Sequence, residues 1–338
     1  MTATAPIKPE SAAPPLVSVL TPFYNEEPYL RECLDSILAQ SYPHFEFILV
    51  DNASTDRSRT IAEEYVQRDS RIRLLACDQH VSMAENLNRA AHEISPQAKY
   101  VKYCFGDDWL YPTCIEQMVG KLEANPRIGS VCAFVLVDNA VFPFGPRVTE
   151  SVMSGREAAR RYLLTGQPMF GTMTASMFRA EVVREREQFF NPQRAADDIE
   201  PEMDSFLKWD FAFIHQILSF ARRQPATTST ALSRLMLMHA SPLICLHKYG
   251  SSFLTPAEFA DRHKCIYRHY GRDVAEGMAR TGFIKVLRAH RHELANAGLA
   301  LPAFSIACGL IGVGFKMLWH PYRSYRALVR DRNDHGSG

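Results

Sequence analysis

The chain has 338 residues, enough for one large α/β domain with an appendage or for two domains. Its formal net charge of +1 argues against an extended nucleic-acid surface, so nucleic acid is not expected as a partner. The eight cysteines show no CxxC or CxxxC spacing, which favours buried free thiols in a reducing compartment over a disulfide framework or a zinc site.

Residues 1–15 are rich in Ala, Pro and Ser and lack the apolar core of a secretory signal, so they are expected to form a disordered tail. Residues 331–338 are expected to form a second one. Between these tails, short runs rich in Val, Ile, Leu and Phe predict strands at 16–20, 45–50, 73–77, 100–105 and 129–136.

Amphipathic helical patterns separate these strands. The first helix is expected to have Pro28 in its first turn, and the second to begin after Ser54 or Thr55 as a cap. This alternation predicts an α/β fold with a mostly parallel sheet flanked by helices on both faces.

The alternation ends after about residue 141. From 151 to 245 we expect helices in "GREAARRYLL" and "MDSFLKWDFAFIHQIL" and strand-like segments in "GTMTASMF" and "ALSRLMLM". Residues 255–296 read as helical and basic. The predicted organisation is therefore one α/β domain at 16–245 and a C-terminal helical region at 246–330.

Polar residues follow each of the first four predicted strands. The first runs into "TPFYNEE", the second into Asp51 and Asn52, the third into Asp78, and the fourth into Asp107 and Asp108. In a parallel sheet these ends meet at one edge, where such sheets bind ligands. No GxGxxG or GxxxxGK[ST] follows the first strand, which excludes the usual dinucleotide and P-loop sites. A carboxylate-rich edge suits instead a nucleotide whose diphosphate is neutralised by Mg²⁺ or Mn²⁺.

Simpler roles exist for the same residues. Asp107 and Asp108 could cap the helix predicted after them, and Asp51 could close an Asx turn.

Four segments in order carry a resemblance to a known family. They are "VSVLTPFYNEEPYLRECLDSILAQSY", "FEFILVDNASTD", "DQHVSMAENLNRAA" and "GDDWLYP". The chain resembles the inverting, nucleotide-sugar-dependent family 2 glycosyltransferases of the GT-A fold, closely over 16–140 and loosely over 141–245. The resemblance implies that Pro22, Tyr24 and Glu26 lie against the nucleotide base and ribose. It further implies that Asp51 and Asn52 contact the base, usually uracil in that family.

The same resemblance implies that Asp107 faces the ribose or sugar and that Asp108 ligates a Mn²⁺ or Mg²⁺ ion. It also implies a catalytic base about a hundred residues later, for which Asp210 on an expected helix is the best local match. His239 stands where many members have a polar or metal-facing histidine, although an ordinary structural histidine is the alternative. The rival acids for the base are Asp197, Asp198, Glu200 and Asp204.

Two positions depart from the family pattern. His80 stands at the usual Gly and Glu85 at the usual Arg of the segment after the third strand, so a cation near the diphosphate is missing there. The implied function is metal-assisted transfer of a hexosyl or N-acetylhexosaminyl group, from a UDP-sugar, to a hydroxyl of a glycan or lipid-linked saccharide. The alternative is a catalytically impaired nucleotide-sugar binding or scaffold protein.

Residues 294–315 are uncharged and are followed by "KMLWHPYRSYRALVRDR". A membrane span, an in-plane helix with its basic flank on anionic lipid, and a helix packed on the catalytic domain are all open. The expected location is the cytoplasm, with peripheral contact through residues 294–330 at the inner face of the cell membrane.

Overall fold

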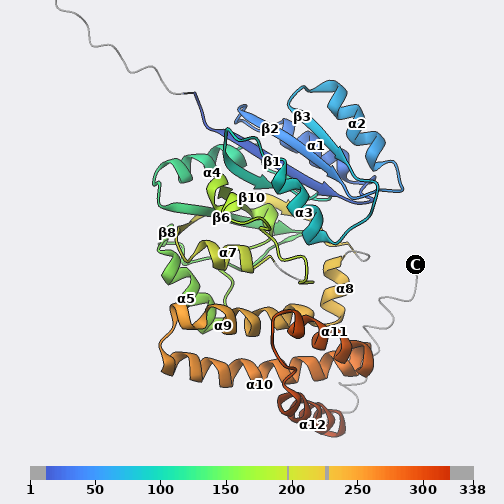
Figure 1. Ribbon diagram of the computed structural model, residues 1–338, viewed down its shortest axis with the longest axis vertical. Coiled ribbons are helices and arrows are strands. Elements are labelled where there is room, and N and C mark those ends of the chain that lie inside the picture. The colour runs from blue at the N-terminus through green and yellow to red at the C-terminus, as the bar shows by residue number, and fades with distance from the viewer. Residues whose placement is uncertain (1–12, 196–197, 225–227, 320–338) are drawn as a thin grey trace, which may run out of the picture.

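The computed structural model describes residues 13–195, 198–224 and 228–319 (Figure 1). Most of the two expected tails therefore lies outside the described residues, as does the candidate Asp197.

One mixed sheet forms the centre of the α/β part. Its strand order is β3-β2-β1-β4-β9-β6-β10-β5, with β7 paired to β6 and β8 to β10. Strands β1 to β4 pair in parallel, as do β6 and β10, whereas β9 runs antiparallel between β4 and β6. The strands are β1 (Leu16–Phe23), β2 (Phe45–Asp51), β3 (Ile72–Ala76), β4 (Ala98–Tyr103), β5 (Trp109–Leu110), β6 (Ile128–Val137), β7 (Ala140–Val141), β8 (Val152–Met153), β9 (Ser176–Arg179) and β10 (Asp210–Ala221).

Helices cover both faces of the sheet because successive strand residues point to opposite sides. Val17 and Val19 of β1 join the apolar faces of α1, α2 and α4 in one buried cluster, whereas Leu20 joins α3 and α6 in another. The helices of the first half are α1 (Leu30–Leu38), α2 (Ser58–Arg68), α3 (Met83–His92), α4 (Cys114–Glu123), α5 (Gly155–Thr165) and α6 (Ala180–Arg184). The predicted α/β class with a mostly parallel sheet is confirmed.

The five strands predicted up to residue 136 are present, with ends shifted by a few residues. The second helix begins later than expected, at Ser58 with Arg57 as its N-cap, and the hydroxyl of Ser54 accepts a hydrogen bond from the Asn25 amide instead.

Two expectations beyond residue 150 are wrong. The helix expected in "MDSFLKWDFAFIHQIL" ends early, because α7 covers Glu200–Ser205 and the remainder forms β10. Phe211, Ala212 and Phe213 are all buried, since β10 is covered on both faces and thus lacks the alternation that marks a half-exposed strand. The strand expected in "ALSRLMLM" is instead α8 (Thr228–Arg234) and the 3₁₀ turn η2 (Leu237–His239). "GTMTASMF" forms the 3₁₀ turn η1 (Met173–Ala175) followed by β9.

Helices fill the C-terminal part, and the expected boundary at residue 245 falls inside α9 (Ala240–Phe253). It is followed by α10 (Pro256–Thr281), α11 (Phe283–Asn296) and α12 (Ala303–Trp319), with α10 lying between α9 and α12 (Figure 1). The uncharged stretch 294–315 is thus split between the end of α11, a link and α12. Among the described residues no helix combines the length and apolar character needed to cross a bilayer.

Candidate active site

The carboxyl ends of β1, β2 and β4 bring three loops together. The Asn52 amide donates to the Phe23 carbonyl at 2.9 Å, and the Gly106 amide donates to the Pro22 carbonyl at 3.3 Å. A Cβ added to Gly106 would lie 2.7 Å from the Phe23 Cβ, so this close approach requires glycine. Pro22 itself lies within β1 and is buried, which places it beneath the loops.

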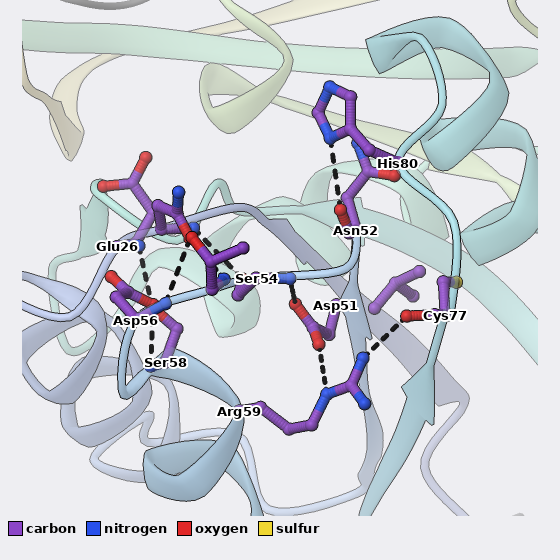
Figure 2. A network of polar contacts seen from close by, with 12 residues as sticks. Glu26, Asp51, Asn52, Ser54, Asp56, Ser58, Arg59, Cys77 and His80 are labelled. Carbon is purple, nitrogen blue, oxygen red and sulfur yellow. Dashed lines mark hydrogen bonds and ion pairs between the residues drawn. The ribbon is translucent and has the colours of Figure 1, made fainter.

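The segment after β2 holds the segment after β1 through backbone and hydroxyl groups (Figure 2). The Glu26 amide donates to Ser58 Oγ at 2.8 Å, and the Thr55 amide donates to Asn25 Oδ1 at 2.8 Å. Asn25 and Ala53 have positive φ angles of 55° and 62°, so both segments turn sharply here. The loop carrying Glu26 is therefore fixed by its neighbour.

Asp51 is wholly buried at the end of β2, and both its carboxylate oxygens are engaged (Figure 2). Oδ1 accepts from the Ser54 amide at 2.9 Å, as in an Asx turn, and Oδ2 accepts from Arg59 Nε at 2.6 Å. Arg59 Nη2 in turn donates to the Cys77 carbonyl at 2.6 Å. Asp51 thus ties the loop to α2 and to the end of β3.

Asn52 and His80 shape the other side of this edge. The Asn52 side chain donates to the Val81 carbonyl at 2.9 Å and accepts from the Val81 amide at 3.0 Å. His80 Nδ1 lies 3.2 Å from the Asn52 carbonyl, which only accepts, so Nδ1 carries the proton. The rings of His80 and Tyr24 lie 4.3 Å apart, and Tyr24 is 40% exposed. The histidine at the family's glycine position therefore forms an accessible aromatic pair with Tyr24.

Glu26 and Asp107 share one donor. Gln224 Nε2 donates to Glu26 Oε2 at 3.0 Å and to Asp107 Oδ2 at 2.8 Å. Burial, and then the charge of Asp107, raise the pKa of Glu26 to about 7. Burial likewise raises the pKa of Asp107.

Asp108 is 5% exposed and is held from two sides. Oδ2 accepts from Thr174 Oγ1 and Oδ1 accepts from the Arg222 amide at 3.0 Å. Burial, and then the charge of Asp107, hold its pKa well above its usual range. Helix α4 begins at Cys114 with Thr113 as its N-cap, so Asp107 and Asp108 do not cap it. The simpler explanation for this pair is therefore wrong.

Asp107 and Asp108 fit a divalent cation that takes its remaining ligands from phosphate oxygens and water. Two buried carboxylates with raised pKa values gain stability as anions when a cation is near. Mg²⁺ and Mn²⁺ sites often use only one or two carboxylates. The described residues contain no group of three or more His, Cys, Asp and Glu side chains arranged to hold a metal.

His239 ends η2, and its Nδ1 lies 2.8 Å from Asp273 Oδ2 on α10. No contact in the described part of the chain joins it to Asp107 or Asp108. The structure therefore does not bring His239 to the expected metal site.

Asp210 is not on a helix, and its position is a correction to the expected site. It is the first residue of the twelve-residue strand β10, opposite Ile128, and pairs with Arg127 at 3.1 Å. The other end of β10 leads into Arg222, whose amide holds Asp108. At about 3.3 Å per residue the two ends are roughly 35 Å apart. Asp210 thus lies at the opposite edge of the sheet.

The rival acids differ in their surroundings. Asp204 pairs with Arg186 and Glu200 pairs with Arg194. Glu202, a further acid in α7 that was not among the candidates, is buried and accepts from Ser130 Oγ at 2.8 Å. Asp198 has no ion pair within the described residues, and burial raises its pKa.

Thr174, Arg222 and Gln224 are site residues that the sequence did not predict. Arg222 and Gln224 follow β10 in "RRQP", so the rule of polar residues at strand ends would have found them had β10 been recognised as a strand. Thr174 has no comparable signal, since it reaches Asp108 from 66 residues away along the chain.

Comparison with known proteins identifies the family of the chain. The chain matches the family described as Glycosyl transferase family 2 over residues 18–186, half of its length. It is 37% identical over 121 residues to the uncharacterized glycosyltransferase EpsJ of Bacillus subtilis, a match that covers 36% of this chain and 34% of EpsJ. It is 39% identical over 121 residues to the putative teichuronic acid biosynthesis glycosyltransferase TuaG of the same organism, covering 36% and 45% of the two chains. The aligned part thus spans less than half of either relative.

Solved structures share the fold over most of the chain. S. aureus TarS residues 1–349 superpose with a TM-score of 0.61 at 15% identity, covering 87% of this chain and 88% of that one. The mannosyltransferase PcManGT of Pyrobaculum calidifontis gives a TM-score of 0.54 at 20% identity, covering 95% and 87%. The chain therefore belongs to glycosyl transferase family 2 and has the GT-A fold.

Proposed function

We propose that the protein transfers a sugar from a nucleotide-sugar, with a UDP-sugar as the favoured donor, to a hydroxyl of a saccharide or lipid-linked saccharide. The observation that carries this proposal is the gathering of Glu26, Asp107 and Asp108 at one sheet edge with raised pKa values. The fold neighbours support it, since TarS has been solved with UDP-GlcNAc and PcManGT with GDP-Man and Mn²⁺.

Asp107 and Asp108 would hold the Mn²⁺ or Mg²⁺ ion. When bound, such a cation would stabilise the negative charge that develops on the departing diphosphate, mainly in the transition state. Thr174 and Arg222 keep the Asp108 carboxylate in one orientation, because each engages a different oxygen. Gln224 keeps Asp107 beside Glu26.

The aromatic pair of Tyr24 and His80 is the proposed stacking surface for the nucleotide base. Aromatic side chains offer a planar apolar face that suits any base, and this pair is accessible. Asn52 positions His80 through its backbone carbonyl. A contact between Asp51 and the nucleotide base stays a prediction. Both carboxylate oxygens of Asp51 already accept hydrogen bonds within the protein, so this residue also shapes the loop.

We propose Asp198 as the catalytic base in place of Asp210. Glu202 lies one turn after Asp198 and anchors α7 to Ser130 of β6. Two residues further along β6, Cys132 pairs with Ser176 of β9. Strand β9 continues from η1, which contains Thr174 and so adjoins Asp108. A carboxyl group with a raised pKa suits the removal of a proton from the acceptor hydroxyl. Such displacement on the face opposite the leaving group inverts the anomeric configuration.

The alternative of a binding protein without turnover rested on an absent base and on Glu85 in place of the usual arginine. Glu85 instead completes a capping box with Ser82 at the start of α3. Arg222 supplies a cation at the same sheet edge, with its Nε 3.3 Å from the Asp107 carbonyl. A positive group is therefore present near the proposed diphosphate site, which favours turnover.

Titration calorimetry with UDP, GDP and dTDP, each with and without Mn²⁺, tests the proposal. We expect UDP to bind in a Mn²⁺-dependent manner and Asp108→Asn to lose at least tenfold in affinity, because one carboxylate ligand is removed. Asp261→Asn, an exposed change on α10, is the matched control and should bind as the wild type does. Binding that is equally strong without metal would contradict the assigned role of Asp108, and binding without donor hydrolysis or transfer would favour the scaffold alternative.

A further inference from the structure

Helix α12 exposes an apolar face. Between residues 303 and 314 its exposed positions follow helical spacing on one side, and none is charged: Ala303, Phe304, Ala307, Cys308, Ile311 and Gly312. Phe304 is 83% exposed and Ile311 is 61% exposed. A continuous apolar stripe of this kind on a protein surface indicates an interaction site.

The opposite side of α12 is locked against α10. A Cβ added to Gly309 would lie 2.2 Å from the Gly271 carbonyl oxygen, and one added to Gly271 would lie 2.1 Å from the Ser305 carbonyl oxygen. Ile306 belongs to the large buried cluster of the C-terminal part. Because these contacts fix the rotation of α12, the apolar face cannot turn inward.

Two exposed basic residues lie beside this face. Arg268 and Arg272 are exposed on α10, within one helical turn of the Gly271 crossing, and Arg272 also lies 3.3 Å from Asp273. The sequence from 277 to 319 is basic overall, because its only acidic residue is Glu293, which is buried. The basic residues of that stretch are Arg280, Lys285, Arg288, Arg291 and Lys316. The sequence beyond 319 adds Arg323, Arg326, Arg330 and Arg332 against Asp331 and Asp334.

We propose that this face docks on the surface of an anionic lipid bilayer, with α12 lying in the plane of the interface. Phe304 and Ile311 enter the boundary between headgroups and acyl chains, while Arg268 and Arg272 stay at the level of the lipid phosphates. A second copy of the chain fits less well, because a symmetric dimer through this face would bring two cationic rims together. The proposal does not depend on the proposed glycosyl transfer.

Vesicle flotation of the full chain tests the proposal. We expect binding to vesicles of phosphatidylglycerol and phosphatidylcholine, and much weaker binding to pure phosphatidylcholine or at high salt. The double variant Phe304→Ser/Ile311→Ser should lower the partition coefficient at least about tenfold, because two apolar side chains no longer enter the interface. Val148→Ser, at a site 79% exposed in the α/β part, is the matched control and should bind as the wild type does. Circular dichroism melting establishes that each variant is folded.

A bimane label on the exposed Cys308, in a Cys77→Ser/Cys265→Ser background, reports the depth of the helix directly. Its emission should shift to the blue when anionic vesicles are added. Absence of binding to anionic vesicles, or binding unaffected by the double variant, would overturn the proposal. So would a dimer that the double variant dissociates in the absence of vesicle binding.

Discussion

At the scale of single residues, His80 stands where the family pattern usually has glycine. The ring lies against Tyr24 and donates from Nδ1 to the Asn52 carbonyl. In the neutral ring with this tautomer, Nε2 is the hydrogen-bond acceptor. A stacking surface and an acceptor are thus combined in one side chain.

Replacing His80 by Ala should weaken UDP binding about three- to tenfold, which corresponds to the loss of one aromatic contact of about 1 kcal/mol. His80→Phe keeps the stacking surface and should recover most of that affinity. Titration calorimetry measures both, with Gln79→Ala at the exposed neighbouring position as the control. Equal affinity of the Ala variant and the wild type would remove His80 from the base site.

Glu202 makes stability depend on pH. Burial raises its pKa to about 7 from an ordinary value of 4.5, so the folded protein keeps this proton over a range in which the unfolded chain releases it. The free energy of unfolding should therefore fall as the pH rises from 4.5 to 7. Glu202→Gln cannot ionise and should be more stable than the wild type at pH 8, by about 3 kcal/mol, with the difference vanishing near pH 4. Urea unfolding at both pH values measures this, and a constant difference would contradict it.

At the scale of elements, a buried set of ion pairs joins α11 to the loop before α7. Arg194 lies 2.8 Å from Glu293 and 3.1 Å from Glu200, and all three side chains are almost wholly buried. The Ala195 amide also donates to Glu293 at 3.1 Å. The C-terminal helices thus position the loop that leads to Asp198.

Glu293→Leu should lower the free energy of unfolding by about 3–5 kcal/mol, because Arg194 loses a buried partner. The double variant Arg194→Met/Glu293→Leu should lose less than the sum of its single variants, since neither charge of this pair is left behind and Glu200 keeps its ion pair with Lys248. Urea denaturation of the four proteins in this cycle measures the coupling. Additive losses would show that the pair acts independently.

Elements also explain which predictions from the sequence were accurate. Strands β1 to β4 and β6 were predictable because their apolar runs stop at turn residues, and parallel pairing then places Glu26, Asp51 and Asp107 on one edge. β10 was mistaken for a helix because both its faces are buried and its sequence does not alternate. Asp210 was assigned to the site for that reason.

At the scale of the whole molecule, the site is completed by contacts that no local pattern reveals. Gln224 reaches Asp107 across 117 residues of sequence, and Arg222 reaches Glu32 across 190. These partners follow from the placement of β9 beside β4 and of β10 between β6 and β5 in the same sheet. The family segments could be recognised because each is a short continuous piece of sequence. The strand pairing that brings Arg222 and Gln224 to the site joins residues far apart in the sequence, so no short segment reveals it.

Lys102 is another long-range feature of the whole fold. It lies wholly buried in β4, and its ammonium donates to the carbonyls of Thr174 and Ser176, directly behind the hydroxyl that holds Asp108. Its positive charge lowers the pKa of Asp108, in opposition to burial. In the proposed reaction, product release would remove the nucleotide, and a cation held through it would leave as well. Lys102 belongs to the fold and would remain, so the next donor would meet a site in which Thr174 and Arg222 still hold Asp108.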